Sequence, residues 1–320
     1  MARTRYATDR GLIARMGATM FLLGLVFTAF ILVVVLLLTR FTNVSNGGII
    51  FFAVVIAVAI SFGSFYWSDK IALATAGARE VTPRQAPELH GVIDRLCALA
   101  DMPKPRVAIA PADMPNAFAT GRSSKVAVVC VTQGLLRRLD RNELEGVLAH
   151  EMSHVAHKDV AVMTIASFLG IMAGLLVRFA FYSELFGGGG RDRRGGGGGD
   201  QNTFPVVLVV LLVGIVVYAI SFLLIRLLSR YRELSADRSG ALLTGQPSAL
   251  ASALVKVSGE MSRIPTRDLR TAEPLNAFYF APALSTRGGG PSLSNIFSTH
   301  PSLDKRLKAL DEISKQLSSR

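Results

Sequence analysis

The chain has 320 residues, of which half are hydrophobic and 18% charged, and its mean hydropathy is +0.41. This composition excludes an ordinary soluble domain and predicts a membrane protein with a sizeable soluble part. Two cysteines exclude a disulfide scaffold. The net charge of +12 is typical of basic residues that face anionic lipid rather than nucleic acid, because the chain lacks the pattern of interleaved aromatic and basic residues that nucleic-acid platforms use.

The N-terminal part, residues 1–69, is predicted to be a cytosolic tail followed by a transmembrane hairpin. Residues 17–38 and 49–67 are apolar runs long enough to cross a bilayer, and a short polar segment separates them. The tail is the more basic flank, so the positive-inside rule puts the N-terminus in the cytosol. The arginines of this tail are Arg3, Arg5, Arg10 and Arg15.

The next part, residues 70–159, has the pattern of a soluble domain. We expect a helix from Ala86 to about Ala100 and then three short strands rich in β-branched residues. The strands are expected at 106–110, 116–121 and 125–132. Asp140 and Glu143 then form the sequence pattern of a capping box, which marks the start of another helix.

That second helix carries the pentapeptide His150-Glu151-Met152-Ser153-His154. Residues four apart share one face of a helix, so the two histidines are able to bind the same metal ion. Glu151 would lie beside that ion as the general base that takes a proton from the attacking water. The pattern therefore predicts a site for one Zn²⁺ per chain, with an exposed polar helix face as the alternative.

Residues 160–227 are expected to return to the membrane. Two further apolar runs, at about 160–182 and 204–227, are joined by a glycine-rich loop at 187–199. The loop composition is typical of a flexible linker, because such glycine density is costly to order. The sequence leaves open whether these two runs cross the membrane fully or only enter it.

The last part, residues 228–320, is predicted to complete the soluble domain with helices around one loose segment at 282–297. The helices are expected at Tyr231–Leu243, Pro247–Met261 and about Ser302–Leu317. Because helices dominate over a small sheet, the predicted fold class is α+β, mainly helical, attached to a transmembrane helix bundle.

A hydrolytic zinc site needs a third protein ligand. His157 lies near the same helix face, but one straight helix cannot easily arrange three side chains around a tetrahedral ion. Glu233 and Asp237 are four apart on the helix expected after the fourth run, so one can bind zinc while the other supports it. On the residues alone, solvated carboxylates among arginines are an equal alternative.

The order of these motifs resembles the HtpX-type membrane zinc endopeptidases, which are gluzincins related to the CAAX prenyl proteases. The motifs are the N-terminal hairpin, the His-Glu-x-x-His pentapeptide, Glu233-x-x-x-Asp237, and a segment from His300 to Arg306, and together they cover nearly the whole chain. The resemblance implies a gluzincin-type protease domain in which Glu233 is the third zinc ligand.

The resemblance also implies roles for residues around the metal. His300 is expected near the active site, where it stabilises the oxyanion, and Arg306 is expected to pair with Asp237 and hold the ligand helix. The segment Asn116-Ala-Phe-Ala-Thr120 resembles an edge strand that binds extended substrate, with Asn116, Ala117 and Phe118 as its expected substrate residues and a plain sheet strand as the alternative.

The expected function is therefore a zinc metalloendopeptidase in the cytoplasmic membrane of a bacterium, multi-pass, with its active site facing the cytosol. Its expected partners are protein or peptide substrates and the lipid bilayer, without nucleic acid, and the family implies a role in membrane protein quality control under stress. The alternatives are an inactive metal-binding scaffold, a CAAX-type prenyl protease, and an intramembrane protease. The charged residues that flank the pentapeptide disfavour the last of these. The sequence leaves the oligomeric state unknown.

Overall fold

The computed structural model describes residues 10–41, 59, 62–63, 65–159, 162–163, 203–261 and 300–319. Close contacts divide the chain into two units, and each unit is assembled from segments that are far apart in sequence. One unit contains Met1–Arg15, Gly63–Val162 and Arg226–Arg320. The other contains Met16–Phe62 and Met163–Ile225.

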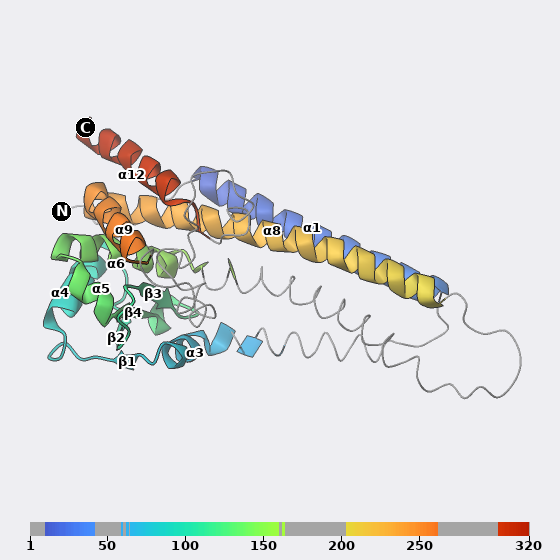
Figure 1. Ribbon diagram of the computed structural model, residues 1–320, viewed down its shortest axis with the longest axis horizontal. Helices are drawn as coiled ribbons and strands as arrows, with labels where there is room; N and C mark the ends of the chain where they lie inside the picture. The colour runs from blue at the N-terminus through green and yellow to red at the C-terminus, as the bar shows by residue number, and fades with distance from the viewer. Residues whose placement is uncertain are drawn as a thin grey trace, which may run out of the picture. The chain divides into compact units, whose positions relative to one another are not determined.

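Two long helices carry the apolar sequence that the structure describes. Helix α1, Arg10–Phe41, encloses the predicted run at 17–38, and helix α8, Thr203–Thr244, begins with the predicted run at 204–227 (Figure 1). Among the described residues, Leu212–Thr244 is the one helix with the length and apolar composition to cross a membrane, and Ile13–Val26 is a shorter apolar stretch. The predicted segments that lie wholly or mostly outside the described residues are 49–67, 160–182, 187–199 and 282–297.

Helix α8 corrects one expectation. A separate helix was expected to begin at Tyr231 after the fourth apolar run, but α8 continues without interruption to Thr244. The reason is local, since residues 228–230 contain neither glycine nor proline and so no signal that would end a helix. The polar C-terminal part of α8 is consequently a direct extension of its apolar part.

A small mixed sheet forms one layer of the unit that contains Gly63–Val162, and the strand order is β1-β2-β4-β3. Strands β2 and β4 are parallel, whereas β1 and β3 run antiparallel to their neighbours. The strands are β1 Arg79–Glu80, β2 Arg106–Ala110, β3 Ala117–Thr120 and β4 Val128–Thr132. The strand expected from residue 125 starts at Val128, because Ser124–Val126 forms the short 3₁₀ helix η1.

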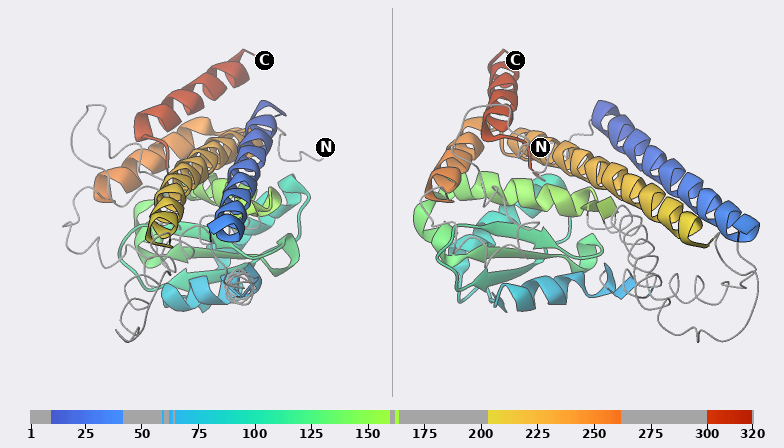
Figure 2. Two further views of the ribbon diagram at one scale, coloured as in Figure 1. Left: turned by 90° about the vertical axis from the view of Figure 1, so that its right-hand side faces the viewer. Right: turned by 45° about the vertical axis from the view of Figure 1, so that its right-hand side comes forward.

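The two faces of the sheet are covered by different helices, as the period-two alternation of strands requires. Val107, Val129 and Val131 face the main core, which includes residues of helices α4 and α6, while Ala108 and Cys130 face a smaller cluster with Ala72 of α3. Figure 2 shows α6 over one side of the sheet and α3 over the other. The helices are α3 Ser68–Thr75, α4 Pro87–Ala100, α5 Gln133–Arg138 and α6 Arg141–Ala156.

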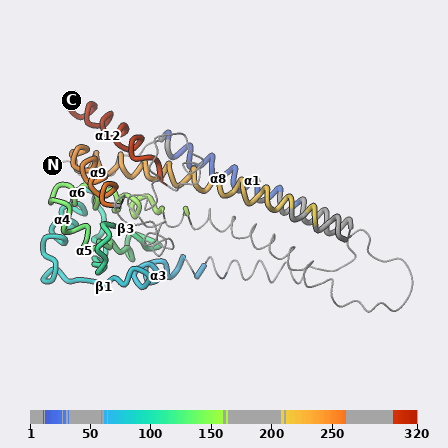
Figure 3. Tube along the Cα trace, viewed as in Figure 1, coloured from blue at the N-terminus to red at the C-terminus, as the bar shows by residue number. Residues whose placement is uncertain are grey.

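Helix α6 is fixed at its start and along its length. Asp140 Oδ1 accepts hydrogen bonds of 2.9 Å from the N–H groups of Asn142 and Glu143, and Glu143 Oε2 accepts one of 3.0 Å from the Asp140 N–H. The predicted capping box is therefore confirmed. Helix α9, Pro247–Met261, packs against both α6 and α12, Leu303–Ser318 (Figure 3). The close approach of α9 to α6 depends on Gly146, where a Cβ would lie 3.2 Å from the Leu250 backbone.

Candidate metal centre

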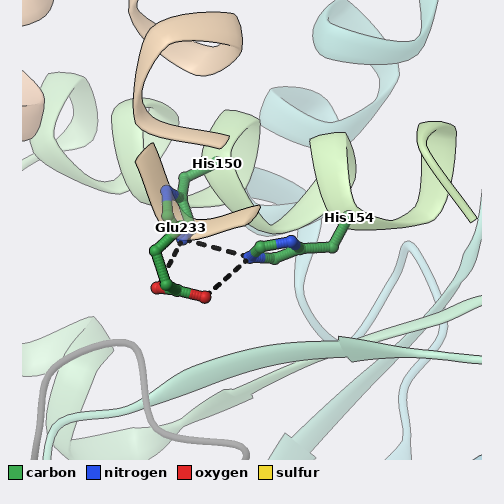
Figure 4. Close-up of side chains that lie close together, drawn as sticks. All are labelled: His150, His154 and Glu233. Carbon is green, nitrogen blue, oxygen red and sulfur yellow. Dashed lines mark hydrogen bonds and ion pairs between the residues drawn. The ribbon is translucent and has the colours of Figure 1, made fainter. Parts of the chain in front are cut away.

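His150 and His154 lie one turn apart on α6, and their rings face the same point. The ring centroids are 4.9 Å apart and the ring planes nearly perpendicular, so the two Nε2 atoms approach each other at 3.3 Å. Glu233, from the polar part of α8, points into the same space, with its carboxylate opposite both rings (Figure 4). The three side chains converge although their helices are separated in sequence by residues 157–202.

The three side chains lie close enough to share one metal ion. Glu233 Oε1 lies 3.5 Å from His154 Nε2, and Glu233 Oε2 lies 3.7 Å from His150 Nε2. Two ligands at about 2.0–2.1 Å from zinc, separated by the tetrahedral angle, are about 3.3–3.4 Å apart. Among the described residues, these three form the group of His, Cys, Asp and Glu side chains that could hold a metal ion. Two imidazoles and one carboxylate are also a ligand set that zinc favours.

The region behind His150 supports this orientation. His150 Nδ1 lies 2.9 Å from Asp237 Oδ1, and Asp237 receives two hydrogen bonds of 2.6 and 2.7 Å from the guanidinium of Arg306. A carboxylate that faces Nδ1 keeps the proton on that nitrogen, so Nε2 presents its lone pair to the centre. The side chain of Arg306 is only 1% exposed, which makes Asp237 its natural counter-charge. The structure thus contains the Asp237–Arg306 pair that the family resemblance implied, and its role in holding the ligand helix stays a prediction.

His154 has an equivalent partner that sequence reasoning missed. Its Nδ1 lies 2.5 Å from Asp159 Oδ2, and Asp159 is almost completely buried. Burial lowers the pKa of His154, but the hydrogen bond and charge of Asp159 outweigh burial and raise it. The centre is therefore electrostatically suited to positive charge.

Glu233 enters the centre as a carboxylate. Burial opposes its ionisation, but the imidazole of His300, whose Nδ1 lies 3.0 Å from Glu233 Oε2, helps to hold the pKa of Glu233 well below its usual value. His300 therefore lies next to the candidate metal centre, as the family resemblance implied, although its catalytic role stays a prediction. His157, the alternative third ligand, is the residue that follows α6 and is not part of the converging group.

Glu151 lies on the side of α6 that faces the sheet. Its Oε2 accepts a hydrogen bond of 3.1 Å from the backbone N–H of Ala119 in β3. Burial raises the pKa of Glu151 to about 8, and a cation bound nearby would lower it again, because positive charge favours the carboxylate. A carboxyl group with a pKa near neutrality is suited to accept and return a proton.

Strand β3 lies at the edge of the sheet, and its register decides which backbone groups face outward. Asn116 O accepts a hydrogen bond of 2.9 Å from the Thr132 N–H, so Asn116 and, by alternation, Phe118 pair with the neighbouring strand. The backbones of Ala117 and Ala119 consequently face the other side, where Ala119 meets Glu151. The resemblance implies Asn116, Ala117 and Phe118 as substrate residues, which stays a prediction, and the structure adds the contact of Ala119 with Glu151.

Known proteins resemble this chain over most of its length. The model of the family described as Peptidase family M48 matches residues 83–314. A relative from Streptomyces coelicolor, Protease HtpX homolog 1, is 58% identical over 316 residues, which cover 98% of this chain and 97% of the relative. A Protease HtpX homolog from Moorella thermoacetica is 48% identical over 320 residues and 99% of both chains.

One solved structure shares the fold. The crystal structure of S. mikatae Ste24p matches 89% of this chain with a TM-score of 0.52 and 16% sequence identity. The matched part spans 62% of that longer protein. The mainly helical fold with a small mixed sheet, which the sequence predicted, is therefore confirmed.

Proposed function

The chain belongs to peptidase family M48, and we propose that it is a membrane-anchored, zinc-dependent endopeptidase whose zinc is held by His150, His154 and Glu233. The observation that carries this proposal is the convergence of two imidazole nitrogens and one carboxylate at 3.3 to 3.7 Å from one another. The other ring nitrogen of each histidine, Nδ1, faces a buried carboxylate. Histidine ligands of metals usually have this arrangement.

The proposed chemistry assigns the proton transfers to Glu151. When bound, zinc supplies a Lewis acid that activates water and polarises the scissile carbonyl. Glu151 takes a proton from the attacking water and returns it to the leaving amine nitrogen. His300, held beside Glu233, is proposed to donate a hydrogen bond to the negative oxygen that develops in the transition state.

The outward backbone of β3 is the proposed site for substrate. An extended peptide can pair with the outward backbone of Ala117 as an additional strand, while the N–H of Ala119 stays with Glu151, and such pairing demands little of the peptide's side chains. This mode of binding suits a protease that acts on unfolded segments. It predicts that N-methylation of the substrate backbone at paired positions reduces cleavage, whereas conservative changes of the same side chains have little effect.

The proposed location is the cytoplasmic membrane of a bacterium, with four membrane segments and the zinc site at the cytosolic face. Arginines are concentrated before residue 16 and again after residue 225. The positive-inside rule assigns such basic segments to the cytosol, which supports this orientation. A protease in this position can reach damaged membrane proteins from the cytosol. We therefore propose a role in membrane protein quality control under stress.

Metal analysis combined with a proteolysis assay tests the proposal. The full chain, purified in detergent, should contain one zinc ion and cleave casein, lose cleavage when a chelator removes the metal, and regain it when zinc is returned. Protein that cleaves casein without a metal ion would overturn the zinc assignment. Protein that binds zinc without cleaving casein or unfolded membrane protein would support the inactive scaffold instead.

A further inference from the structure

The chain turns sharply where α6 ends. The N–H of His157 donates to Ser153 O at 2.9 Å and that of Lys158 to Val155 O at 3.2 Å, which closes the helix. Lys158 has a φ of +58°, the left-handed conformation that a non-glycine residue adopts at a cost of about 1–2 kcal/mol. This turn brings Asp159 back beneath the last turn of the helix, within reach of His154.

Asp159 is held from two sides. Its Oδ2 lies 2.5 Å from His154 Nδ1 and 3.0 Å from Nε of Arg232, while its side chain is only 3% exposed. The carboxylate of Asp159 therefore meets an imidazole on one side and a guanidinium on the other. A buried carboxylate and a mostly buried arginine would each be costly alone.

Asp159 is placed to orient the histidine rather than to bind metal. It contacts Nδ1, whereas the atom of His154 that faces His150 and Glu233 is Nε2, on the other side of the ring. Arg232 precedes Glu233 directly in α8. One turn of α8 thus provides the proposed ligand Glu233 and also Arg232, the cation that holds Asp159 against the proposed ligand His154.

We infer that Asp159 and Arg232 are positioning residues that fix the orientation and tautomer of His154 for metal binding, and this inference rests on the proposed zinc site. They form a second clamp, separate from Asp237 and Arg306, which act on His150. Each proposed histidine ligand then has its own buried carboxylate, and each carboxylate its own arginine.

The test measures zinc affinity by chelator competition on the full chain in detergent. Asp159→Ala should weaken zinc binding about 10- to 100-fold, the loss expected when a histidine ligand loses its carboxylate partner. Asp159→Asn should fall between Asp159→Ala and wild type, because its amide oxygen still accepts the hydrogen bond but carries no charge. Asp94→Asn is the matched control. Asp94 lies on α4 and forms an exposed ion pair with Lys104, so this variant should leave zinc affinity unchanged.

Two further variants separate positioning from a general effect on folding. Arg232→Ala should weaken zinc binding, and Arg232→Lys should restore most of it, because the positive charge is retained. If Arg232 acts through Asp159, adding Arg232→Ala to Asp159→Ala should weaken binding no further. A double variant that is weaker by the full effect of Arg232→Ala would overturn the proposed chain of contacts.

The cobalt-substituted protein provides a readout that stability alone does not change. Asp159→Asn should keep its circular dichroism spectrum and shift the visible absorption of bound cobalt(II), because the geometry at His154 changes. Wild-type affinity and an unchanged cobalt spectrum in both Asp159→Asn and Arg232→Ala would refute the inference while leaving the zinc site intact. Wild-type protein that binds no zinc would instead refute the proposed function on which the inference rests.

Discussion

The backbone N–H of Ala119 in β3 donates a hydrogen bond of 3.1 Å to Oε2 of Glu151 in α6. This contact joins the edge of the sheet to the proposed general base. It fixes the distance between the strand proposed to align a peptide and the carboxylate proposed to activate water. A shift of either element would therefore disturb substrate alignment and proton transfer together.

Glu151→Gln should retain zinc and lose hydrolysis. The amide oxygen of glutamine can still accept the hydrogen bond from Ala119, so the geometry should persist, but the side chain can no longer accept a proton. We expect the rate of casein cleavage to fall by about 100-fold or more. Zinc content and cleavage measured on the same sample check this, and normal turnover would show that another group is the base.

Glu233→Ala should remove the metal. It deletes one of three proposed ligands, so zinc affinity should fall further than the about 100-fold that loss of an outer partner costs. Glu80→Ala, which removes an exposed carboxylate paired with Arg106, is the matched control and should retain zinc. Stoichiometric zinc in Glu233→Ala would contradict this assignment and favour His157 as the third ligand.

Gly240→Ala should displace the proposed ligand helix. A Cβ at residue 240 would lie 2.9 Å from the backbone nitrogen of His150, closer than packed atoms allow. We expect a loss of about 1–3 kcal/mol in stability and a weaker zinc site. Gly91→Ala on α4 is the control, because a Cβ there meets nothing within 4 Å and should stabilise the helix by about 0.5–1 kcal/mol. Equal thermal midpoints for the two variants would contradict this packing argument.

Glu143→Gln should destabilise the protein in a pH-dependent way. Burial raises the pKa of Glu143, but hydrogen bonds from Lys256 and Ser252 outweigh burial and lower it below its usual value. A lowered pKa stabilises the folded state above the unfolded value of about 4.3, and that contribution is lost as the pH falls through the folded pKa. The variant should therefore be less stable than wild type at pH 7, by about 1 kcal/mol or less, because the ion pair with Lys256 is lost, and the difference should shrink towards pH 3. A constant difference across this range would exclude the charge of Glu143 as its cause.

The features that local patterns specify were predictable from the sequence. The capping box of Asp140, the strand at Arg106–Ala110 and the helix Pro247–Met261 depend on residues close together in the chain, and all three are present as expected. The prediction of a separate helix from Tyr231 was wrong because no local residue pattern supports a helix end there. The drop in hydropathy predicts a boundary there, but no residue at this position ends a helix, and α8 continues to Thr244.

The contacts that sequence reasoning missed depend on distant or unusual geometry. Asp159 reaches His154 only because Lys158 adopts a left-handed conformation, and a lysine gives no signal for such a turn. Ala119 faces Glu151 because of the register between β3 and β4, which single-strand patterns do not specify. Glu233 and Asp237 have similar chemistry and equivalent spacing, so the packing of α8 against α6 decides which one faces the centre.

The order of the motifs along the chain has a consequence for biosynthesis. A nascent polypeptide on the ribosome contains His150 and His154 long before residue 233 has been made, and Arg306 is made later still. Until then the two imidazoles have no carboxylate opposite them and Asp237 lacks its guanidinium partner. The complete set of proposed site residues is therefore present only late in synthesis. An unfinished chain lacks the proposed active site while its apolar segments are still being made.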